Sequence, residues 1–151
     1  MRIVLQRVSR ASVTVAGEVV GSIADGLLLL VGIEPTDTPQ DVDRAADKVS
    51  NLRIFADEGG LMNRSIIDIG GSALVVSQFT LISDMRRGRR PSFVGAADPG
   101  TAAPLVERLA EMLRDAGIHT ETGVFGASMA VDLVNDGPVT VILEIREGRV
   151  S

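Results

Sequence analysis

The sequence predicts an α+β single domain over residues 1–151, built as a mostly antiparallel, barrel-like β-sheet with two amphipathic helices. Three observations lead to this prediction. Apolar runs of strand length dominate the chain, only two segments place apolar residues at helical spacing, and no repeat or linker interrupts the sequence. With 151 residues, of which 45% are hydrophobic, one core can bury roughly 68–70% of the unfolded surface.

Two strands and a hairpin are expected in the first part of the chain. Arg2–Val8 alternates loosely between apolar and polar residues. Residues 13–23 place apolar residues on either side of an Ala16-Gly17 pair, which is typical of a hairpin. Leu27–Ile33 is apolar at nearly every position, and this predicts a central strand that is covered on both faces.

The first helix is expected to begin at Thr38-Pro39-Gln40-Asp41. This segment offers a hydroxyl cap, a proline at the first helical position and an acid three residues after the cap. The apolar residues that follow at helical spacing are Val42, Ala45, Ala46, Val49 and Leu52. One face of this helix should therefore pack inward.

A turn, a strand and a long loop are expected in the middle of the chain. Asp57–Gly60 is rich in turn-forming residues. Ser72–Gln78 is an apolar run that predicts another buried strand. Ser83–Gly100 is polar, rich in arginine and contains proline, so it predicts a loop, and loops of this length tend to be functional.

A second helix and two further strands should close the chain. The helix carries Leu105, Leu109, Met112 and Leu113 on one face, with Gly117 as its stop. The first strand points Met129, Val131 and Leu133 to one side, and the second does so with Val139, Val141, Leu143 and Ile145. Asn135–Pro138 between them has the residues of a turn.

Composition excludes several classes of protein. The absence of cysteine excludes disulfides, thiolate zinc sites and a cysteine nucleophile. The longest apolar run, Leu27–Val31, is much shorter than the roughly 18–20 residues of a membrane span. The N-terminus lacks the pattern of a signal peptide, so we expect a soluble cytoplasmic protein with no membrane partner.

The distribution of charge is more informative than its sum. A net charge of −5 argues against indiscriminate nucleic-acid binding. Four arginines, Arg86, Arg87, Arg89 and Arg90, nevertheless fall within five residues. A local basic patch on an acidic body suits brief contact with one end of a nucleic acid. The alternative is a solvated arginine loop.

The usual catalytic side chains are scarce. The only histidine is His119, in a polar stretch that favours an exposed strand-edge position over a Ser-His-Asp triad. One histidine without cysteine makes a zinc site improbable, and we expect no metal and no cofactor. The Gly-Gly pairs at 59–60 and 70–71 lack the spacing and the lysine of a phosphate-binding loop.

Ser77, Gln78, Phe79 and Thr80 remain as catalytic candidates at the end of a buried strand. Backbone N–H groups there can receive a developing oxyanion, a contribution of roughly 3–4 kcal/mol per donor. Thr80 offers a hydroxyl nucleophile, but no general base is near it in sequence. The alternative is that Ser77 and Thr80 only cap the strand end.

Gly137 and Pro138 form the second candidate segment. Turn chemistry alone explains Asn135–Pro138, and a functional interpretation depends on a cis Gly137–Pro138 bond. Glycine before proline permits unusual backbone angles, which would let the segment project two carbonyl groups in one direction.

Taken together, these segments resemble the D-aminoacyl-tRNA deacylase family, also called D-tyrosyl-tRNA deacylase, from Met1–Val8 to the final strand. One departure is Arg87, where such proteins often carry lysine. The matching stretches are Ala11–Val13, Asn51–Phe55, Met62-Asn63, Ser77–Leu81, Arg90–Phe93, Thr122–Ala127 and Asn135–Thr140.

The resemblance implies hydrolysis of the ester between a D-amino acid and the terminal adenosine of tRNA, by a homodimer with its active site at the subunit interface. Gly137 and Pro138 of one subunit would clamp the substrate amino group in the other and leave no room for an L side chain. Glycyl-tRNA would then also be a substrate. Ser77–Thr80 would lie beside the adenosine, whose ribose 2′-OH could help to activate water.

The resemblance also implies a set of pocket-lining residues: Pro91, Ser92, Phe93, Phe125, Gly126, Ala127 and Met129. Two other functions remain open. One is an editing module of the same fold that removes mischarged L-amino acids, and the other is a non-catalytic RNA-binding dimer.

Overall fold

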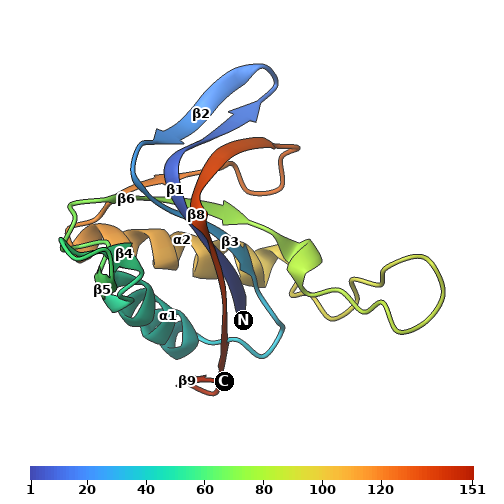
Figure 1. Ribbon diagram of the computed structural model, residues 1–151. Helices are drawn as coiled ribbons and strands as arrows, with labels where there is room; N and C mark the ends of the chain where they lie inside the picture. Colours follow the sequence, from blue (N-terminus) through green and yellow to red (C-terminus); the bar gives the residue numbers. More distant parts are fainter.

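The computed structural model describes residues 1–151 as a curved sheet with two helices on one face (Figure 1). The strand order is β7-β6-β3-β1-β8-β9, and β2 pairs with the outer part of β1. The elements are β1 (Arg2–Val15), β2 (Glu18–Ile23), β3 (Gly26–Gly32), α1 (Pro39–Asn51), β4 (Phe55–Ala56), β5 (Met62–Arg64), β6 (Ser72–Ser77), the 3₁₀ turn η1 (Phe79–Leu81), α2 (Pro99–Asp115), β7 (His119–Thr122), β8 (Ala130–Arg146) and β9 (Arg149–Val150).

Strand directions in the main sheet are mixed. The ladders β1–β2, β1–β3, β1–β8 and β8–β9 are antiparallel, so the prediction of a mostly antiparallel sheet is confirmed. The ladders β3–β6 and β6–β7 are parallel, which the strand patterns of the sequence do not indicate. Each parallel pair is joined through a helix, because a crossover must return the chain to the starting edge of the sheet.

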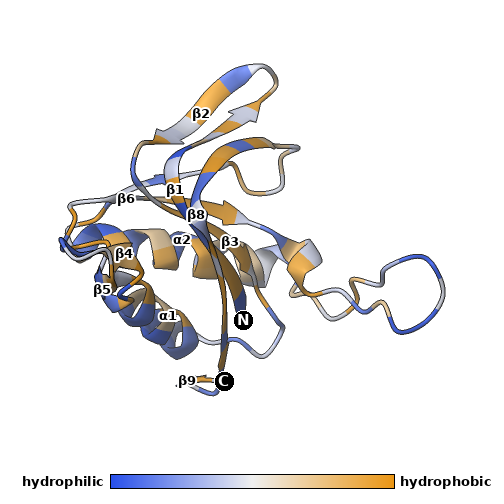
Figure 2. Ribbon diagram, in the orientation of Figure 1, coloured by the Kyte–Doolittle hydropathy of each residue, from blue (hydrophilic) through white to orange (hydrophobic).

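The main core lies between the sheet and the two helices. Ile3 and Leu5 of β1 are fully buried there, together with Leu29 of β3. Val49 of α1 and Leu109 of α2 meet them from the helical side. Figure 2 shows strands β3 and β6 as hydrophobic along much of their length, whereas the tip of the long projecting loop is hydrophilic.

Both helices begin with side-chain caps. Thr38 Oγ1 accepts a hydrogen bond from the Asp41 backbone N–H at 3.4 Å, and the Asp41 carboxylate accepts one from Thr38 N–H at 2.8 Å. This reciprocal arrangement confirms the predicted helix start. In α2, Asp98 caps the Thr101 N–H, so the helix begins at Pro99, inside the segment predicted as loop.

A single strand replaces the two strands predicted at the C-terminus. β8 follows β1 along nearly its whole length, and the predicted turn is a bulge within it. Gln6 pairs with Thr140 and Val8 pairs with Asn135, so Arg7 alone lies opposite residues 136–139. The turn prediction is wrong because one long partner strand supports both halves of β8, while the turn-forming residues bow outward between them.

The second face of the sheet is covered only in part. Its seven buried residues are Val8, Ala11, Val13, Ile23, Leu28, Leu74 and Val76. Leu30, Val131 and Leu133 pack against them but are only partly buried. No helix in the structure is long and apolar enough to cross a membrane.

Candidate active site

A cavity of about 350 Å³ opens where the parallel strands β3 and β6 end. The carboxyl ends of parallel strands are a common place for ligands, because backbone groups stop pairing there. Its lining comes from four regions of the chain: Val31 and Ile33; Ser77, Gln78 and Phe79; Phe93, Ala96, Ala97, Pro99, Ala102 and Val106; and Phe125 and Gly126. Three of the four predicted catalytic residues therefore share one cavity.

The chain turns sharply at the end of β6. Gln78 N–H donates to the Val31 carbonyl at 2.7 Å, the last bond of the parallel ladder, and η1 follows at once. The first N–H groups of a helical turn have no acceptor within that turn. Accordingly, the backbone N–H groups of Phe79 and Thr80 have no acceptor in the protein. They lie at the strand end where the sequence places the catalytic candidates.

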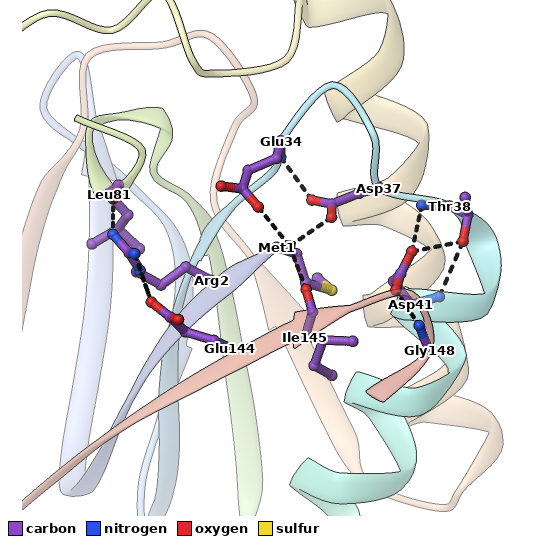
Figure 3. Close-up of polar contacts among 10 residues, drawn as sticks. All are labelled: Met1, Arg2, Glu34, Asp37, Thr38, Asp41, Leu81, Glu144, Ile145 and Gly148. Atoms are coloured by element: carbon purple, nitrogen blue, oxygen red, sulfur yellow. Dashed lines mark hydrogen bonds and ion pairs between the residues drawn. The ribbon is translucent and has the colours of Figure 1, made fainter. Parts of the chain in front are cut away.

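Two contacts hold η1 in place. A side chain at Gly32 would put its Cβ 3.1 Å from the Gln78 carbonyl oxygen, so the glycine allows the turn to approach β3 closely. Arg2 Nη1 donates to the Leu81 carbonyl at 2.8 Å, and Glu144 of β8 binds the same guanidinium at 2.6 Å (Figure 3). This role of Arg2 could not be predicted, because its partner at Leu81 is remote in sequence.

Thr80 lies beside the cavity and does not line it. Its hydroxyl accepts a hydrogen bond from the Gln78 side-chain amide, so the two side chains are joined to one another. Phe79 is 57% exposed and meets Phe93 edge to face, with ring centroids 5.2 Å apart. This aromatic pair forms an apolar wall at the side of the cavity.

The structure brings only some of the predicted pocket residues together. Phe93, Phe125 and Gly126 line the cavity, whereas Pro91, Ser92, Ala127 and Met129 do not. Ser92 instead pairs with Asp84 across the arginine loop, and Met129 packs on the second face of the sheet. The sequence does not predict three alanines that line the cavity, because small apolar residues carry no motif signal. These are Ala96, Ala97 and Ala102.

The four arginines lie on a loop that projects from the body of the molecule (Figure 1). Asp84 and Ser92 close its base. Arg86 binds Asp84 through two hydrogen bonds of 2.9 and 2.6 Å, and this side-chain contact, with the Arg86 backbone N–H, lowers the pKa of Asp84 to about 2. The side chains of Arg87, Arg89 and Arg90 make no hydrogen bond or ion pair with the protein.

Gly137 and Pro138 lie at the outside of the β8 bulge, where both are exposed. The peptide bond between them is cis, and Gly137 has φ +143°, in the region that favours glycine. Neither residue lines the cavity of its own chain. One chain therefore does not bring the two predicted parts of the site together.

Arg7 and Asn135 shape this bulge. Arg7 Nε donates to the Asp136 carbonyl at 2.8 Å, and its Nη1 donates to the Ile54 carbonyl at 2.7 Å. Asn135 Oδ1 accepts from the Val139 N–H at 2.7 Å, which closes the base of the bulge. Arg7 is the one residue opposite the bulge in β1, a position that only the strand register reveals.

Comparison with known proteins identifies the family. The family model described as D-Tyr-tRNA(Tyr) deacylase matches residues 4–144. The chain belongs to this family. A D-aminoacyl-tRNA deacylase of Thermomicrobium roseum is 60% identical over 149 residues, which cover 99% of this chain and 97% of the relative. One from Chloroflexus aurantiacus is 58% identical, with 99% and 93% covered.

Solved structures share the fold. The c-Myc DNA Unwinding Element Binding Protein is 40% identical with a TM-score of 0.89, and the match covers 95% of this chain and 98% of that one. A structure described as a probable eukaryotic D-amino acid tRNA deacylase has a TM-score of 0.82 over 93% and 97% of the two chains. At 17% identity, this second likeness concerns the fold alone.

The cavity of this member of the D-Tyr-tRNA(Tyr) deacylase family contains no ionisable side chain. Its polar side chains are Ser77 and Gln78, and the others are apolar or glycine. Such a site can bind an apolar or planar group against its walls and can stabilise negative charge with backbone N–H groups. His119 lies elsewhere, exposed on the edge strand β7, as predicted.

Proposed function

We propose that this protein hydrolyses the ester that joins a D-amino acid to the 3′-terminal adenosine of tRNA, and so removes D-amino acids before translation uses them. The supporting observation is a cavity without acid or base beside two unpartnered N–H groups, in a chain of the D-Tyr-tRNA(Tyr) deacylase family. We place this activity in the cytoplasm, where charged tRNA is used.

The proposed reaction relies on the main chain and on the substrate. Water adds to the ester carbonyl carbon, and the N–H groups of Phe79 and Thr80 bind the resulting oxyanion. The ribose 2′-OH of the adenosine assists in activating that water, because no side chain of the cavity is a base. The C–O bond to the ribose then breaks, the ribose oxygen takes a proton, and tRNA and the free amino acid leave.

Selection of the D configuration is assigned to Gly137 and Pro138 of a second subunit. Their exposure at the β8 bulge, outside the cavity of their own chain, supports a role toward a partner. In the proposed homodimer they bind the substrate amino group and block the space of an L side chain. Glycine has no side chain to block, so glycyl-tRNA is hydrolysed as well.

The homodimer is supported by the partly covered second face of the sheet and by the free edge of β8. Ile142 of β8 is 64% exposed and Val134 is 39% exposed. Beyond β8, only the short β9 pairs, at Ile145 and Arg146. An exposed apolar edge strand of this length favours association with a second copy.

Contact with tRNA is assigned to the projecting arginine loop. Arg87, Arg89 and Arg90 carry charges that no acid of the protein neutralises, whereas Arg86 is engaged by Asp84. Guanidinium groups suit phosphate recognition, because their planar donors match two phosphate oxygens. We include Arg86, at the base of the loop, among the residues that are proposed to contact tRNA.

Hydrolysis of matched tyrosyl-tRNA substrates tests the proposal. We expect the purified protein to hydrolyse D-tyrosyl- and glycyl-tRNA and to spare L-tyrosyl-tRNA. An Ala102→Trp variant, which places an indole in the cavity, serves as the control and should lose activity while it stays folded. Hydrolysis of the L substrate alone would identify an editing module, and binding without hydrolysis would identify an RNA-binding dimer.

A further inference from the structure

The α-amino group of Met1 is buried at the end of the sheet opposite the β1–β2 hairpin (Figure 1). Its ammonium donates to Asp37 Oδ1 at 2.6 Å and to the Ile145 carbonyl at 2.8 Å, and Glu34 Oε2 lies at 3.5 Å (Figure 3). The Met1 residue is only 1% exposed and belongs to the main core. Three acceptors thus surround a group with three N–H donors.

The acceptors are themselves held in place. Asp37 has a side chain only 3% exposed, and its second oxygen accepts from the Glu34 backbone N–H at 2.7 Å. The Ile145 carbonyl belongs to β8, next to Glu144, which binds Arg2. The ammonium therefore joins β1, the loop before α1 and the end of β8 at a single buried point.

We propose that a free α-amino group on Met1 is a maturation requirement of this protein, so that any N-acyl group must be removed or withheld before the native structure is complete. A formyl or acetyl group turns the ammonium into a neutral amide with one N–H. The buried Asp37 carboxylate then lacks its cation, and such an unpaired buried charge is strongly destabilising.

Where the new chain carries an N-acyl group, the reaction that must precede native docking is its deacylation. For a formylated start, water adds to the formyl carbon, the C–N bond breaks, formate leaves and the amine takes up a proton. Because Met1 itself packs in the core, the requirement includes retention of the methionine. The assignment depends only on the buried contacts and is independent of the reaction proposed for the cavity.

Four forms of the protein test this inference by thermal unfolding. They are the chain with authentic Met1, the chain with Nα-acetylated Met1, the chain with Gly-Ser before Met1, and a control with Gly-Ser after the exposed Ser151. We expect the authentic and control forms to have the same Tm. The acetylated and N-terminally extended forms should unfold at least roughly 5 °C lower. Equal Tm values for all four forms would overturn the proposal.

An Asp37→Asn background identifies the cause of the lower Tm. If the ammonium–carboxylate pair carries the effect, N-terminal extension should lower the Tm much less in this background than in the parent chain. An undiminished effect would show that bulk rather than charge is responsible and would overturn the assigned role of the ammonium. If the extended chain does not fold, proteolytic release of authentic Met1 followed by refolding should restore the parental Tm.

Discussion

In the proposed reaction, the Ser77–Thr80 segment acts through main-chain rather than side-chain groups. The Gln78 amide donates to the Thr80 hydroxyl, so these side chains are already engaged with one another. The N–H groups of Phe79 and Thr80 have no acceptor and lie beside the cavity. Substitutions that keep the backbone donors should therefore be tolerated better than substitutions that remove them.

Thr80→Ala should keep kcat/KM for D-tyrosyl-tRNA within roughly tenfold of the parent, since a hydrogen bond between neutral groups contributes only about 1 kcal/mol. Phe79→Pro removes one N–H and should lower kcat/KM about 100- to 1,000-fold relative to Phe79→Ala, which lacks the ring but keeps the donor. Single-turnover hydrolysis measures all three variants. Abolished activity in folded Thr80→Ala that still binds tRNA would identify Thr80 as the nucleophile.

Gly137→Ala should disturb the β8 bulge. The new Cβ would lie 2.8 Å from Val139 Cγ2 and 3.0 Å from Arg7 Nη2, at a φ of +143° that alanine rarely adopts. We expect D-tyrosyl-tRNA hydrolysis to fall about tenfold or more and exclusion of L-tyrosyl-tRNA to weaken.

Gly17→Ala is the matched control for that variant, because Gly17 also has a positive φ but lies in the β1–β2 hairpin with nothing within 4 Å of the new Cβ. It should destabilise the protein without changing the ratio of D to L hydrolysis. An unchanged ratio in Gly137→Ala as well would remove this residue from chiral selection.

At the scale of elements, local signals are sufficient for the start of α1 but not for that of α2, which begins inside the predicted loop. The Thr38 cap, the following proline and Asp41 all lie within four residues, so the start of α1 could be predicted from sequence. The β8 bulge could not, because it exists only through the pairing of β8 with β1 and the hydrogen bond from the Arg7 side chain to Asp136, 129 residues away. The lining alanines of the cavity escaped prediction for the same reason, since tertiary packing alone brings them to the site.

The cap of α1 should make stability depend on pH. Burial acts to raise the pKa of Asp41, but hydrogen bonds from the Gly148 N–H and from Thr38 hold it below the usual 3.8. A lowered folded pKa gives stability that is present above the unfolded pKa and is lost as pH falls through the folded value.

The stability advantage of the parent over Asp41→Asn should therefore be constant near neutral pH, at roughly 1–3 kcal/mol, and should shrink below pH 3.8. Urea unfolding between pH 3 and pH 7 measures this difference. A difference that persists undiminished to pH 3 would contradict the assigned cause.

The arginine loop should set the salt dependence of tRNA binding. Arg89→Gln with Arg90→Gln should weaken binding and lower the slope of log K against log salt by roughly 0.7–0.9 for each arginine–phosphate interaction that is removed. Arg44→Gln with Arg108→Gln removes the same charge from the helix surfaces, where both arginines are paired with aspartates, and should leave the slope unchanged. Equal slopes for both double variants would show that the loop arginines contact no phosphate and are only solvated.

At the scale of the whole molecule, the two predicted halves of the site belong to different parts of the surface. The cavity lies between the ends of β3 and β6 and the start of α2, whereas Gly137 and Pro138 lie on the outer strand β8. In the proposed homodimer, a second copy binds at the partly covered second face and the free edge of β8. Mixed dimers can therefore distinguish a site shared between subunits from one complete in each chain.

Ala102→Trp fills the cavity, and Gly137→Ala disturbs the bulge, so homodimers of either variant should be inactive or weak. A heterodimer of the two has one site in which the intact cavity of one subunit meets the intact Gly137–Pro138 segment of the other. Co-refolding equal amounts should make about half of the dimers mixed, each with one working site, and should restore about a quarter of the parental D-tyrosyl-tRNA hydrolysis. The separately refolded variants, combined without subunit exchange, are the control. If the co-refolded dimers are no more active than this control, each subunit must use its own Gly137–Pro138 segment. The proposal that the two subunits share the site would then be wrong.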